Sequence, residues 1–388
     1  MAPIRVLVVE DSPTVRHHIQ DVLSSDPDVE VAGVAGDGRT AIDLTVRTRP
    51  DVITMDLMLP GVSGLAATEH IMAHHPTPIL VVSSADNRAE MFTTCDALAA
   101  GAVDVLDKPN GAHADAAWEL RLRAAVKLLA RVPVITHPRA RLSPLLQGGN
   151  APGPLASQVS PVSPGLPPLA AAANSRAVRP AASVDPGGAR PCAVVAIGAS
   201  TGGPGAVVDL LRALPRDFAL PILVVQHISA PFAATFVDWL GGQVGRRAVT
   251  ASDGDPVAAG NGRVIMAPPD RHLVVRHGRL RLTDDPERHS CRPSIDTLLE
   301  SVAREYGDLA AGCVLTGMGR DGAAGLLALR RAGGVTFAQD EATSVVYGMP
   351  REAVALGAAQ AVLPPAEIGR RLAGLRREDP DHGRVGHR

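Results

Sequence analysis

Cysteine is scarce in this chain, and the few cysteines present form no motif. Cys95, Cys192, Cys291 and Cys313 stand far apart and give no C-x-x-C pair. This spacing argues against a disulfide framework and against a thiolate zinc site. It is typical of proteins in a reducing compartment, so we expect a cytoplasmic protein.

Long apolar runs and a strong excess of one charge are also missing. No segment keeps the roughly 18 apolar residues that a membrane-spanning helix needs, and the N-terminus lacks the basic flank and apolar core of a signal peptide. We therefore expect no direct membrane insertion. The formal net charge of -2 provides no global positive field for binding nucleic acid. The expected partners are other proteins.

The chain is long enough for two domains, since 388 residues with 46% hydrophobic content exceed what one core usually contains. We expect a first domain over residues 1–125, a linker over 126–190, a second domain over 191–375 and a polar tail over 376–388. The linker is rich in Pro, Ala, Gly and Ser without apolar periodicity, which is typical of a solvated tether. No repeat of solenoid length is visible.

Both domains show the alternation of short β-branched runs with amphipathic stretches that builds a parallel sheet covered by helices. In the first, the first helix is expected to begin after a cap at Ser12 and the last to span Ala114–Leu129. The expected strands of this domain are Arg5–Val9, Val29–Val34, Val52–Met55, Ile79–Ser83 and Val103–Leu106. Those of the second domain are Ala193–Ile197, Ile222–Val225, Val264–Ala267, Leu273–Val275, Cys313–Thr316 and Val335–Ala338.

Three carboxylates are predicted to gather at one edge of the first sheet. Glu10 and Asp11 end its first strand and Asp56 ends its third, and the carboxyl ends of parallel strands share an edge. Such a cluster is hard to keep ionised without a cation, and Mg²⁺ prefers oxygen ligands of this kind. Ser83 and Lys108 follow the fourth and fifth strands, where a hydroxyl and an ammonium could bind phosphoryl oxygens.

These residues, together with the run D-L-M-L-P-G-V-S-G that begins at Asp56 and the pair Lys108-Pro109, resemble a two-component receiver domain. The resemblance implies a flavodoxin-like sheet of five parallel strands. It also implies that Asp56 accepts a phosphoryl group, that Glu10, Asp11 and Asp56 hold Mg²⁺, that Ser83 is the switch hydroxyl and that Lys108 contacts the phosphoryl group. One departure is Val105, because many receivers carry an aromatic residue three positions before the lysine.

A pair of histidines in the first domain also attracts attention. His70 and His74 are spaced to share a helix face at a metal-ligand separation. No third ligand is evident, so we expect no metal there.

In the second domain, one serine stands on a glycine-rich turn after an apolar run. The pentapeptide G-A-S-T-G around Ser200 matches the G-x-S-x-G spacing of a strained turn that exposes a nucleophile. By itself it suits phosphate binding equally well. His227 and Asp321 also follow expected strands, and with Ser200 they fit the serine-histidine-aspartate pattern. Taken singly, His227 could be structural and Asp321 a helix cap.

Five sequence blocks then resemble the catalytic domain of chemotaxis protein-glutamate methylesterases: G-A-S-T-G-G-P from Gly198, V-V-Q-H ending at His227, R-P-S-I-D from Arg292, L-T-G-M-G-R-D-G-A from Leu315 and the run A-Q-D-E-A-T-S-V-V-Y-G-M-P from Ala338. The resemblance implies a doubly wound parallel α/β domain that hydrolyses glutamate methyl esters and deamidates selected glutamines of methyl-accepting receptors, without a cofactor of its own.

The resemblance implies that Ser200 attacks, His227 transfers the proton and Asp321 orients the histidine. We expect oxyanion donors at Thr201 and in the turn centred on Met318. Family members often carry histidine where Cys291 stands, and we expect retained activity with altered packing or substrate contact. A thiol nucleophile at Cys291 is not favoured, since no lowered pKa can be argued from sequence.

The presence of a receiver and a hydrolase in one chain predicts control by phosphorylation. We expect the unphosphorylated receiver to cover the entrance to Ser200 and phosphorylation of Asp56 to loosen it. The expected partners are a chemotaxis-type histidine kinase as phosphodonor and receptor cytoplasmic helices as substrate, with the enzyme acting as a monomer. Two rival functions are a non-catalytic adaptor and a regulator acting on nucleic acid, but no basic recognition helix is visible for the latter.

Overall fold

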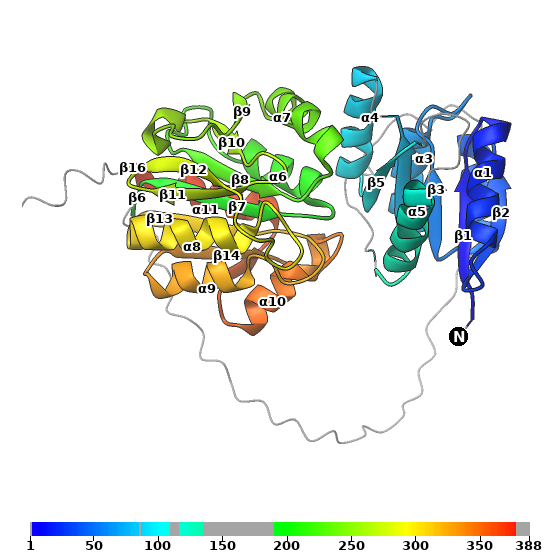
Figure 1. The fold of residues 1–388 in the computed structure, drawn as a ribbon. Coiled ribbons are helices and arrows are strands. Elements are labelled where there is room, and N and C mark those ends of the chain that lie inside the picture. The colour runs from blue at the N-terminus through cyan, green and yellow to red at the C-terminus, as the bar shows by residue number, and fades with distance from the viewer. Residues whose placement is uncertain (1, 85–86, 109–115, 133, 135–189, 378–388) are drawn as a thin grey trace, which may run out of the picture. The chain divides into compact units, whose positions relative to one another are not determined.

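The structure is a computed structural model that describes residues 2–84, 87–108, 116–132, 134 and 190–377 (Figure 1). The predicted linker lies almost entirely outside these ranges, as does the predicted tail from residue 378 onward. The domain limits proposed from composition therefore stay predictions.

The first domain is built on five parallel strands in the order β2-β1-β3-β4-β5. The strands are β1 (Ile4–Val9), β2 (Val29–Ala35), β3 (Val52–Met55), β4 (Ile79–Ser83) and β5 (Asp104–Asp107). The helices are α1 (Pro13–Ser24), α2 (Gly38–Thr48), α3 (Gly64–His74), α4 (Arg88–Ala99) and α5 (Ala116–Leu129). Each predicted strand is found to within a residue at either end, and Ser12 caps α1 by accepting a hydrogen bond from the Val15 N–H.

Both faces of this sheet are covered, because consecutive residues of its central strands β1, β3 and β4 are buried, rather than alternate ones. Leu7 and Val9 of β1 pack with α2, α3 and α4, whereas Val6 and Val8 pack with α1 and α5. Each helix that connects two strands therefore packs against an apolar face of the sheet.

The second domain is built on seven parallel strands in the order β15-β14-β13-β7-β8-β10-β9. Its strands and those of two small sheets are β6 (Pro191–Cys192), β7 (Val194–Ala199), β8 (Ile222–Gln226), β9 (Ala248–Thr250), β10 (Val264–Met266), β11 (His272–Arg276), β12 (Arg279–Thr283), β13 (Ala310–Val314), β14 (Val335–Gln339), β15 (Ala361–Leu363) and β16 (Arg376–Arg377). The helices are α6 (Gly203–Arg212), α7 (Ala230–Val244), α8 (Ile295–Tyr306), α9 (Ala323–Arg331), α10 (Met349–Ala355) and α11 (Pro365–Ala373), with short 3-10 turns at Val257–Gly260, Gly307–Leu309 and Glu341–Thr343.

Helices cover both faces of this sheet as well. One face packs against α6, α7 and α11, and the other against α8, α9, α10 and the β11–β12 hairpin. Figure 1 shows α8 and α9 below the sheet and α6 and α7 above it. The doubly wound parallel architecture is confirmed.

Sequence periodicity missed several strands and left the partner of one undetermined. The expected strand Leu273–Val275 is present as β11, but it pairs antiparallel with β12 outside the parallel sheet. Its turn places His277 at φ 53° and Gly278 at φ 66°, the pair of positive angles that a tight two-residue hairpin needs. The strands β9 and β15 were missed because they are short edge strands and only partly buried, unlike the equally short but fully buried β10.

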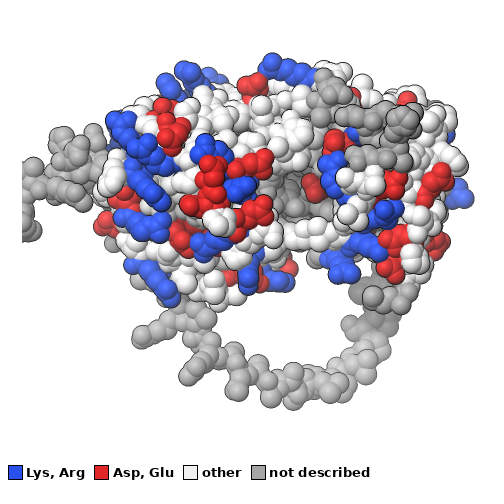
Figure 2. All heavy atoms as spheres, in the orientation of Figure 1, with Lys and Arg blue, Asp and Glu red and all other residues white. Residues whose placement is uncertain are grey.

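The surface carries both signs of charge. On the face drawn in Figure 2, Lys and Arg are interspersed with Asp and Glu over the described residues, in keeping with the small net charge. None of the helices in the described ranges has the length and apolar character that crossing a bilayer requires.

Candidate active site and phosphoacceptor pocket

Ser200 and His227 follow neighbouring strands at the same level of the seven-stranded sheet. Ala199 at the end of β7 pairs with Gln226 at the end of β8. The next residues are therefore also neighbours, and the His227 N–H donates to the Ala199 carbonyl at 3.0 Å. On the other side, the Ser200 N–H donates to the carbonyl of Thr316, just beyond β13, at 3.0 Å. Three strand ends thus meet around Ser200.

Two glycines allow this close approach. Gly202 has φ +72°, a left-handed angle that residues with a Cβ rarely adopt. A Cβ on Gly317 would lie 2.6 Å from the Cβ of Ser200 and 2.7 Å from the Met349 sulfur. The small residues of the two motifs therefore serve packing around the serine as well as turn formation.

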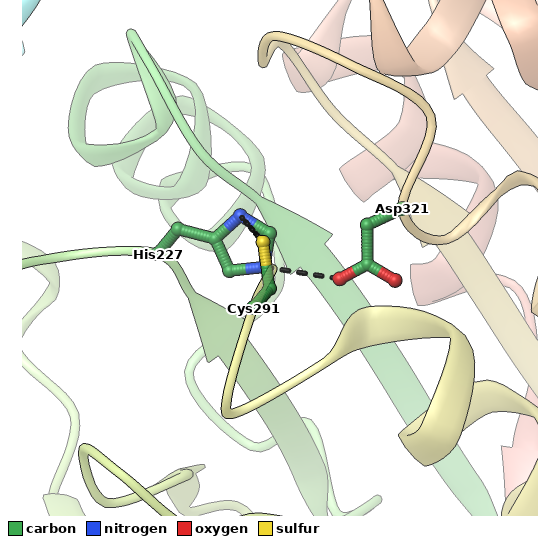
Figure 3. Close-up of side chains that lie close together, drawn as sticks. All are labelled: His227, Cys291 and Asp321. Atoms are coloured by element: carbon green, nitrogen blue, oxygen red, sulfur yellow. Dashed lines mark hydrogen bonds and ion pairs between the residues drawn. The ribbon is translucent and has the colours of Figure 1, made fainter. Parts of the chain in front are cut away.

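His227 and Asp321 are joined by a hydrogen bond. The His227 Nε2 and an Asp321 carboxylate oxygen lie 3.1 Å apart, and Figure 3 shows Asp321 pointing at the imidazole edge. Because an ionised carboxylate only accepts hydrogen bonds, Nε2 carries the proton in the neutral ring. Nδ1 is then the nitrogen left for proton transfer. The Ser200 hydroxyl makes no hydrogen bond to any described residue, so the structure does not show a bond between the serine and the histidine.

Asp321 lies at the N-terminus of α8. One of its oxygens accepts from the Ser294 hydroxyl at 2.8 Å, the Asp296 N–H at 3.0 Å and the Gly322 N–H at 3.1 Å. The other accepts from the Ile295 N–H at 2.7 Å, in addition to His227. The free N–H groups and the dipole of a helix start favour a negative charge. Asp321 is therefore held by another helix rather than serving only as a cap of α9.

These contacts shift the pKa values of both groups. Burial raises the pKa of Asp321, but hydrogen bonds from His227 and from the Asp296 and Ile295 backbone outweigh it, so the pKa falls below its ordinary value. Burial lowers the pKa of His227, but the hydrogen bond with Asp321 and the contact with Cys291 outweigh it and raise the pKa to about 9. Asp321 thus stays ionised and stabilises the imidazolium that forms during proton transfer.

Two supporting residues received no role from the sequence. Ser294 binds Asp321 and also caps α8 through the Thr297 N–H. The Gln226 side-chain amide donates to the carbonyls of Ser200 at 2.8 Å and His227 at 2.9 Å. Their blocks, R-P-S-I-D and V-V-Q-H, carried the family resemblance. A serine just before an apolar helical run was also a readable capping signal.

The two proposed oxyanion donors have unused backbone N–H groups. In the described part of the chain, neither Thr201 nor Met318 donates a backbone hydrogen bond, whereas the N–H of Gly317, which precedes Met318, donates to the Val346 carbonyl at 3.0 Å. Thr201 is fixed through its carbonyl, which accepts from the Thr316 hydroxyl at 2.9 Å. With both N–H groups unused, the oxyanion assignment stays a prediction.

In the first domain, the predicted acidic residues do come together. Val9 pairs with Met55, so Glu10 and Asp56 lie side by side, and carboxylate oxygens of Glu10, Asp11 and Asp56 all lie within 4.8 Å of one another. The Lys108 ammonium lies 2.9 Å from Asp56 and 3.2 Å from Glu10. The two oxygens that face this ammonium, one of Glu10 and one of Asp56, are buried.

This pocket fits a divalent metal ion. Burial and the neighbouring Asp56 charge raise the pKa of Glu10 to about 7, even though Lys108 lowers it. A buried carboxylate that resists ionisation, next to two more carboxylates, gains most from a hard cation with oxygen ligands. The residues present are therefore able to hold such an ion.

Each half of the chain is similar to a known protein family. Residues 195–372 match the CheB methylesterase family and residues 6–115 match the response regulator receiver domain. A protein-glutamate methylesterase/protein-glutamine glutaminase 2 of Anaeromyxobacter dehalogenans is 43% identical over 97% of this chain and 98% of its own. This chain belongs to the CheB methylesterase family.

Two further proteins are similar to this chain. The Nitrosospira multiformis protein-glutamate methylesterase/protein-glutamine glutaminase is 41% identical to this CheB-family chain over 96% of it and 97% of the relative. The crystal structure of the Thermotoga maritima CheB methylesterase catalytic domain is 34% identical, with a TM-score of 0.45 over 47% of this chain and 97% of that domain.

In this CheB-family protein the predicted switch hydroxyl points toward α4. Ser83 donates to the buried Glu90 carboxylate at 3.1 Å and accepts from Thr94 at 2.9 Å. Among the described residues, the Ser83 hydroxyl therefore makes no hydrogen bond to the Asp56 carboxylate or the Lys108 ammonium, although the Lys108 backbone N–H donates to the Ser83 carbonyl at 2.9 Å. Val105, where many receivers carry an aromatic residue, is buried in β5. The hydroxyl is thus held by Glu90 and Thr94, which the sequence analysis did not single out.

The structure also describes the contacts of the histidine pair on α3 and of Cys291. The rings of His70 and His74 stack on α3 with centroids 4.4 Å apart, and His74 Nδ1 lies 2.9 Å from the His70 carbonyl. The sulfur of Cys291 lies 3.9 Å from His227 Nδ1. The departure at Cys291 therefore directly contacts the imidazole.

Proposed function

We propose that the protein is a phosphorylation-controlled serine hydrolase that demethylates glutamate γ-methyl esters on methyl-accepting chemoreceptors and deamidates selected receptor glutamines. It thereby provides adaptation in chemotaxis-type signalling. The observation that carries the proposal is the Asp321–His227 pair beside Ser200 at the carboxyl edge of the sheet. Membership of the family and the names of its relatives supply the substrate class.

In the proposed reaction, the Ser200 oxygen attacks the γ-carbonyl carbon while Nδ1 of His227 takes the hydroxyl proton. The tetrahedral oxyanion is bound by the N–H groups of Thr201 and Met318, and removing one such donor typically costs roughly 3–4 kcal/mol. Collapse breaks the ester C–O bond, and the imidazolium gives its proton to the departing methanol. Asp321 holds the ring and stabilises its positive form.

The acyl-enzyme is then hydrolysed by the same groups. His227 takes a proton from water, the resulting hydroxide attacks the acyl carbon, and Ser200 leaves with the proton returned by the imidazolium. The products are a free glutamate and an unmodified enzyme. With glutamine as substrate, ammonia replaces methanol as the first leaving group.

The test of catalysis is methanol release from a methylated receptor cytoplasmic fragment. Ser200→Ala is expected to bind the fragment normally and to release no methanol above background. The exposed Ser252, replaced by alanine, serves as the matched control and is expected to keep full turnover. Substantial release by Ser200→Ala would show that the nucleophile is misassigned. Normal binding with no release by wild type would favour an adaptor.

Control is proposed to act through Asp56. A chemotaxis-type histidine kinase transfers a phosphoryl group to Asp56, and Lys108 contacts the phosphoryl oxygens. Glu10, Asp11 and Asp56 would hold Mg²⁺, which would neutralise charge on the incoming phosphoryl group. The unphosphorylated receiver covers the entrance to Ser200, and phosphorylation loosens it. The acidic cluster and the ammonium 2.9 Å from Asp56 support this role.

The regulatory half is tested with a small-molecule phosphodonor. Wild type is expected to release methanol faster after the phosphodonor is added, whereas Asp56→Ala is expected not to respond. Asp43→Ala, which removes an exposed carboxylate on α2, is the matched control and should respond like wild type. Equal stimulation of Asp56→Ala would contradict the assignment. We further propose a monomer acting in the cytoplasm, which light scattering and fractionation would check.

A further inference from the structure

Among the four cysteines, Cys291 differs in its surroundings. Cys95, Cys192 and Cys313 are buried, and Cys291 is partly exposed. Burial raises the pKa of Cys95 to about 12 and that of Cys192 to about 11, and it raises that of Cys313 further. Thiols in such surroundings are poor metal ligands, since the thiolate is the binding form. Cys291 is therefore the cysteine available to a ligand from solvent.

A tight turn fixes the Cys291 thiol in place. The Arg288 N–H donates to the Cys291 carbonyl and the Cys291 N–H returns a hydrogen bond to the Arg288 carbonyl, at 3.1 and 3.0 Å. The two residues between them, His289 and Ser290, have φ 55° and 58°. Side chains anchor the turn further, because Arg288 and His289 both contact the buried Asp296 carboxylate. The hydrogen bonds across the turn and its contacts with Asp296 thus hold the thiol next to His227.

The thiol and the imidazole are spaced as two ligands of one metal ion. Cys291 Sγ lies 3.9 Å from His227 Nδ1, and Figure 3 shows the sulfur beside the imidazole ring. Tetrahedral zinc with its usual bond lengths separates a sulfur and a nitrogen ligand by about 3.5 Å, so a movement of a few tenths of an ångström closes the site. Cys291, His227 and Asp321 form one cluster of atoms that are all within 4.8 Å.

Asp321 already occupies the supporting position for such a site. Its oxygens accept hydrogen bonds from Ser294, Ile295, Asp296, Gly322 and His227. It is therefore better placed to hold His227 Nε2 than to bind the metal itself. In zinc sites, a histidine that ligates the metal through one ring nitrogen commonly donates a hydrogen bond to a carboxylate through the other.

We propose that Cys291 Sγ and His227 Nδ1 form an inhibitory site for Zn²⁺ or a similar thiophilic divalent ion, completed by water. As the Zn–S bond forms, the thiol proton passes to solvent, and the lone pair of Nδ1 is taken up by the metal. That lone pair is the one that accepts the serine proton in the proposed reaction, so the bound ion stops hydrolysis. The inhibition rests on the proposed function, whereas metal binding at the site does not.

The first measurement is methanol release by the full-length protein against Zn²⁺ concentration, with excess Mg²⁺ to fill the carboxylate pocket. Wild type is expected to be inhibited and to recover on chelation. Each rate is divided by the same variant's metal-free rate. Cys291→Ala should then need on the order of tenfold more Zn²⁺, or still more, to reach the same fractional inhibition, because loss of a ligand weakens metal binding. Cys291→His should stay sensitive, and His74→Gln on α3 is the surface-histidine control.

The second measurement uses Co²⁺ as a spectroscopic probe and needs no enzymatic activity. Wild type is expected to show the thiolate-to-cobalt charge-transfer absorption, and Zn²⁺ should displace it. Cys291→Ala and Cys291→His should both lack the band. Equal Zn²⁺ sensitivity of wild type and Cys291→Ala, or a cobalt–thiolate band that survives in Cys291→Ala, would overturn the proposal. A band without any methanol release in any variant would contradict the proposed function and leave the metal site standing.

Discussion

The receiver pocket should destabilise its own domain when no cation is bound, and replacing Glu10 by glutamine should remove this penalty. Glu10 is fully buried and lies beside Asp56, with Lys108 as its nearby cation. Glutamine has nearly the shape of a protonated glutamate but cannot ionise. Glu10→Gln therefore isolates the cost of ionising this one side chain.

The size of the effect follows from the shift in pKa. Folding raises the pKa of Glu10 from 4.5 to about 7. Each tenfold change in proton affinity corresponds to about 1.4 kcal/mol, so at a pH above both values the ionised side chain costs about 3 kcal/mol. The folded state binds the extra proton between these values, so the free energy of unfolding falls as pH rises from 4.5 to 7 and levels off above that. A bound cation, present at one hundred times its Kd, raises the free energy of unfolding by about 2.7 kcal/mol.

The assay is denaturant unfolding of the full chain at pH 5 and pH 8, in chelator and in Mg²⁺. The two tryptophans are Trp118 in α5 and Trp239 in α7, so a Trp239→Phe background makes the fluorescence report the receiver. In chelator at pH 8, Glu10→Gln is expected to exceed wild type by about 3 kcal/mol, on the order of 10 °C in melting temperature. At pH 5 the two should nearly agree. Mg²⁺ should stabilise wild type far more than the variant.

The matched control is Glu30→Gln, which removes an exposed carboxylate from β2. It should show no such difference between the two pH values. If Glu10→Gln is no more stable than wild type at pH 8 in chelator, the carboxylate is not held against its ionisation, and the electrostatic argument for the metal site is wrong.

Three further predictions concern the chemistry and its switch. Ser294→Ala removes the hydroxyl that donates a hydrogen bond to the ionised Asp321. Denaturation should show a free energy of unfolding lower by roughly 1.5–3 kcal/mol. Steady-state methanol release should show that kcat falls more than KM changes. The methanol-release rate should rise with pH up to about 9, because His227 must be neutral to accept a proton; a flat profile between pH 6 and 9 would contradict the raised pKa. The raised pKa of His227 also contributes to the free energy of unfolding. This contribution is fully present below pH 6.5 and is lost as pH rises through 9. Thr94→Val removes a hydrogen bond that holds Ser83 toward α4, so half-maximal activation should need severalfold less phosphodonor, since such a bond is worth about 1 kcal/mol; an unchanged dose response would refute this switch role.

Much of the fold was readable because the local pattern and the global arrangement agree. The β1 run I-R-V-L-V-V and the β7 run V-V-A-I-G-A are buried on both faces, as parallel strands between two helical layers require. The short β9 and β15 and the pairing of β11 with β12 were beyond this reasoning. The first two are partly buried strands at the edges of the sheet, and a tight turn at Gly278 decided that β11 would fold back on β12.

The site was readable at the level of which residues gather. Strand order in a parallel sheet brings carboxyl ends together, so Ser200, His227, Glu10 and Asp56 could be grouped from their positions alone. The supporting contacts could not be found this way. Ser294 reaches Asp321 across 27 positions of the chain, and no periodic pattern encodes where the start of one helix meets the turn before another.

The sequence by itself thus determined the two α/β domains, the chemistry at their strand ends and the family to which the chain is similar. Alternation and strand-end residues are local properties, and short-range sterics and solvation read them directly. Only the tertiary structure decided that Nε2 of His227 faces Asp321, that Ser83 turns toward Glu90 and Thr94, and that Cys291 lies against the imidazole. Side-chain direction depends on which donors and charges the packing brings near, and those neighbours are fixed only when distant segments of the chain have folded together.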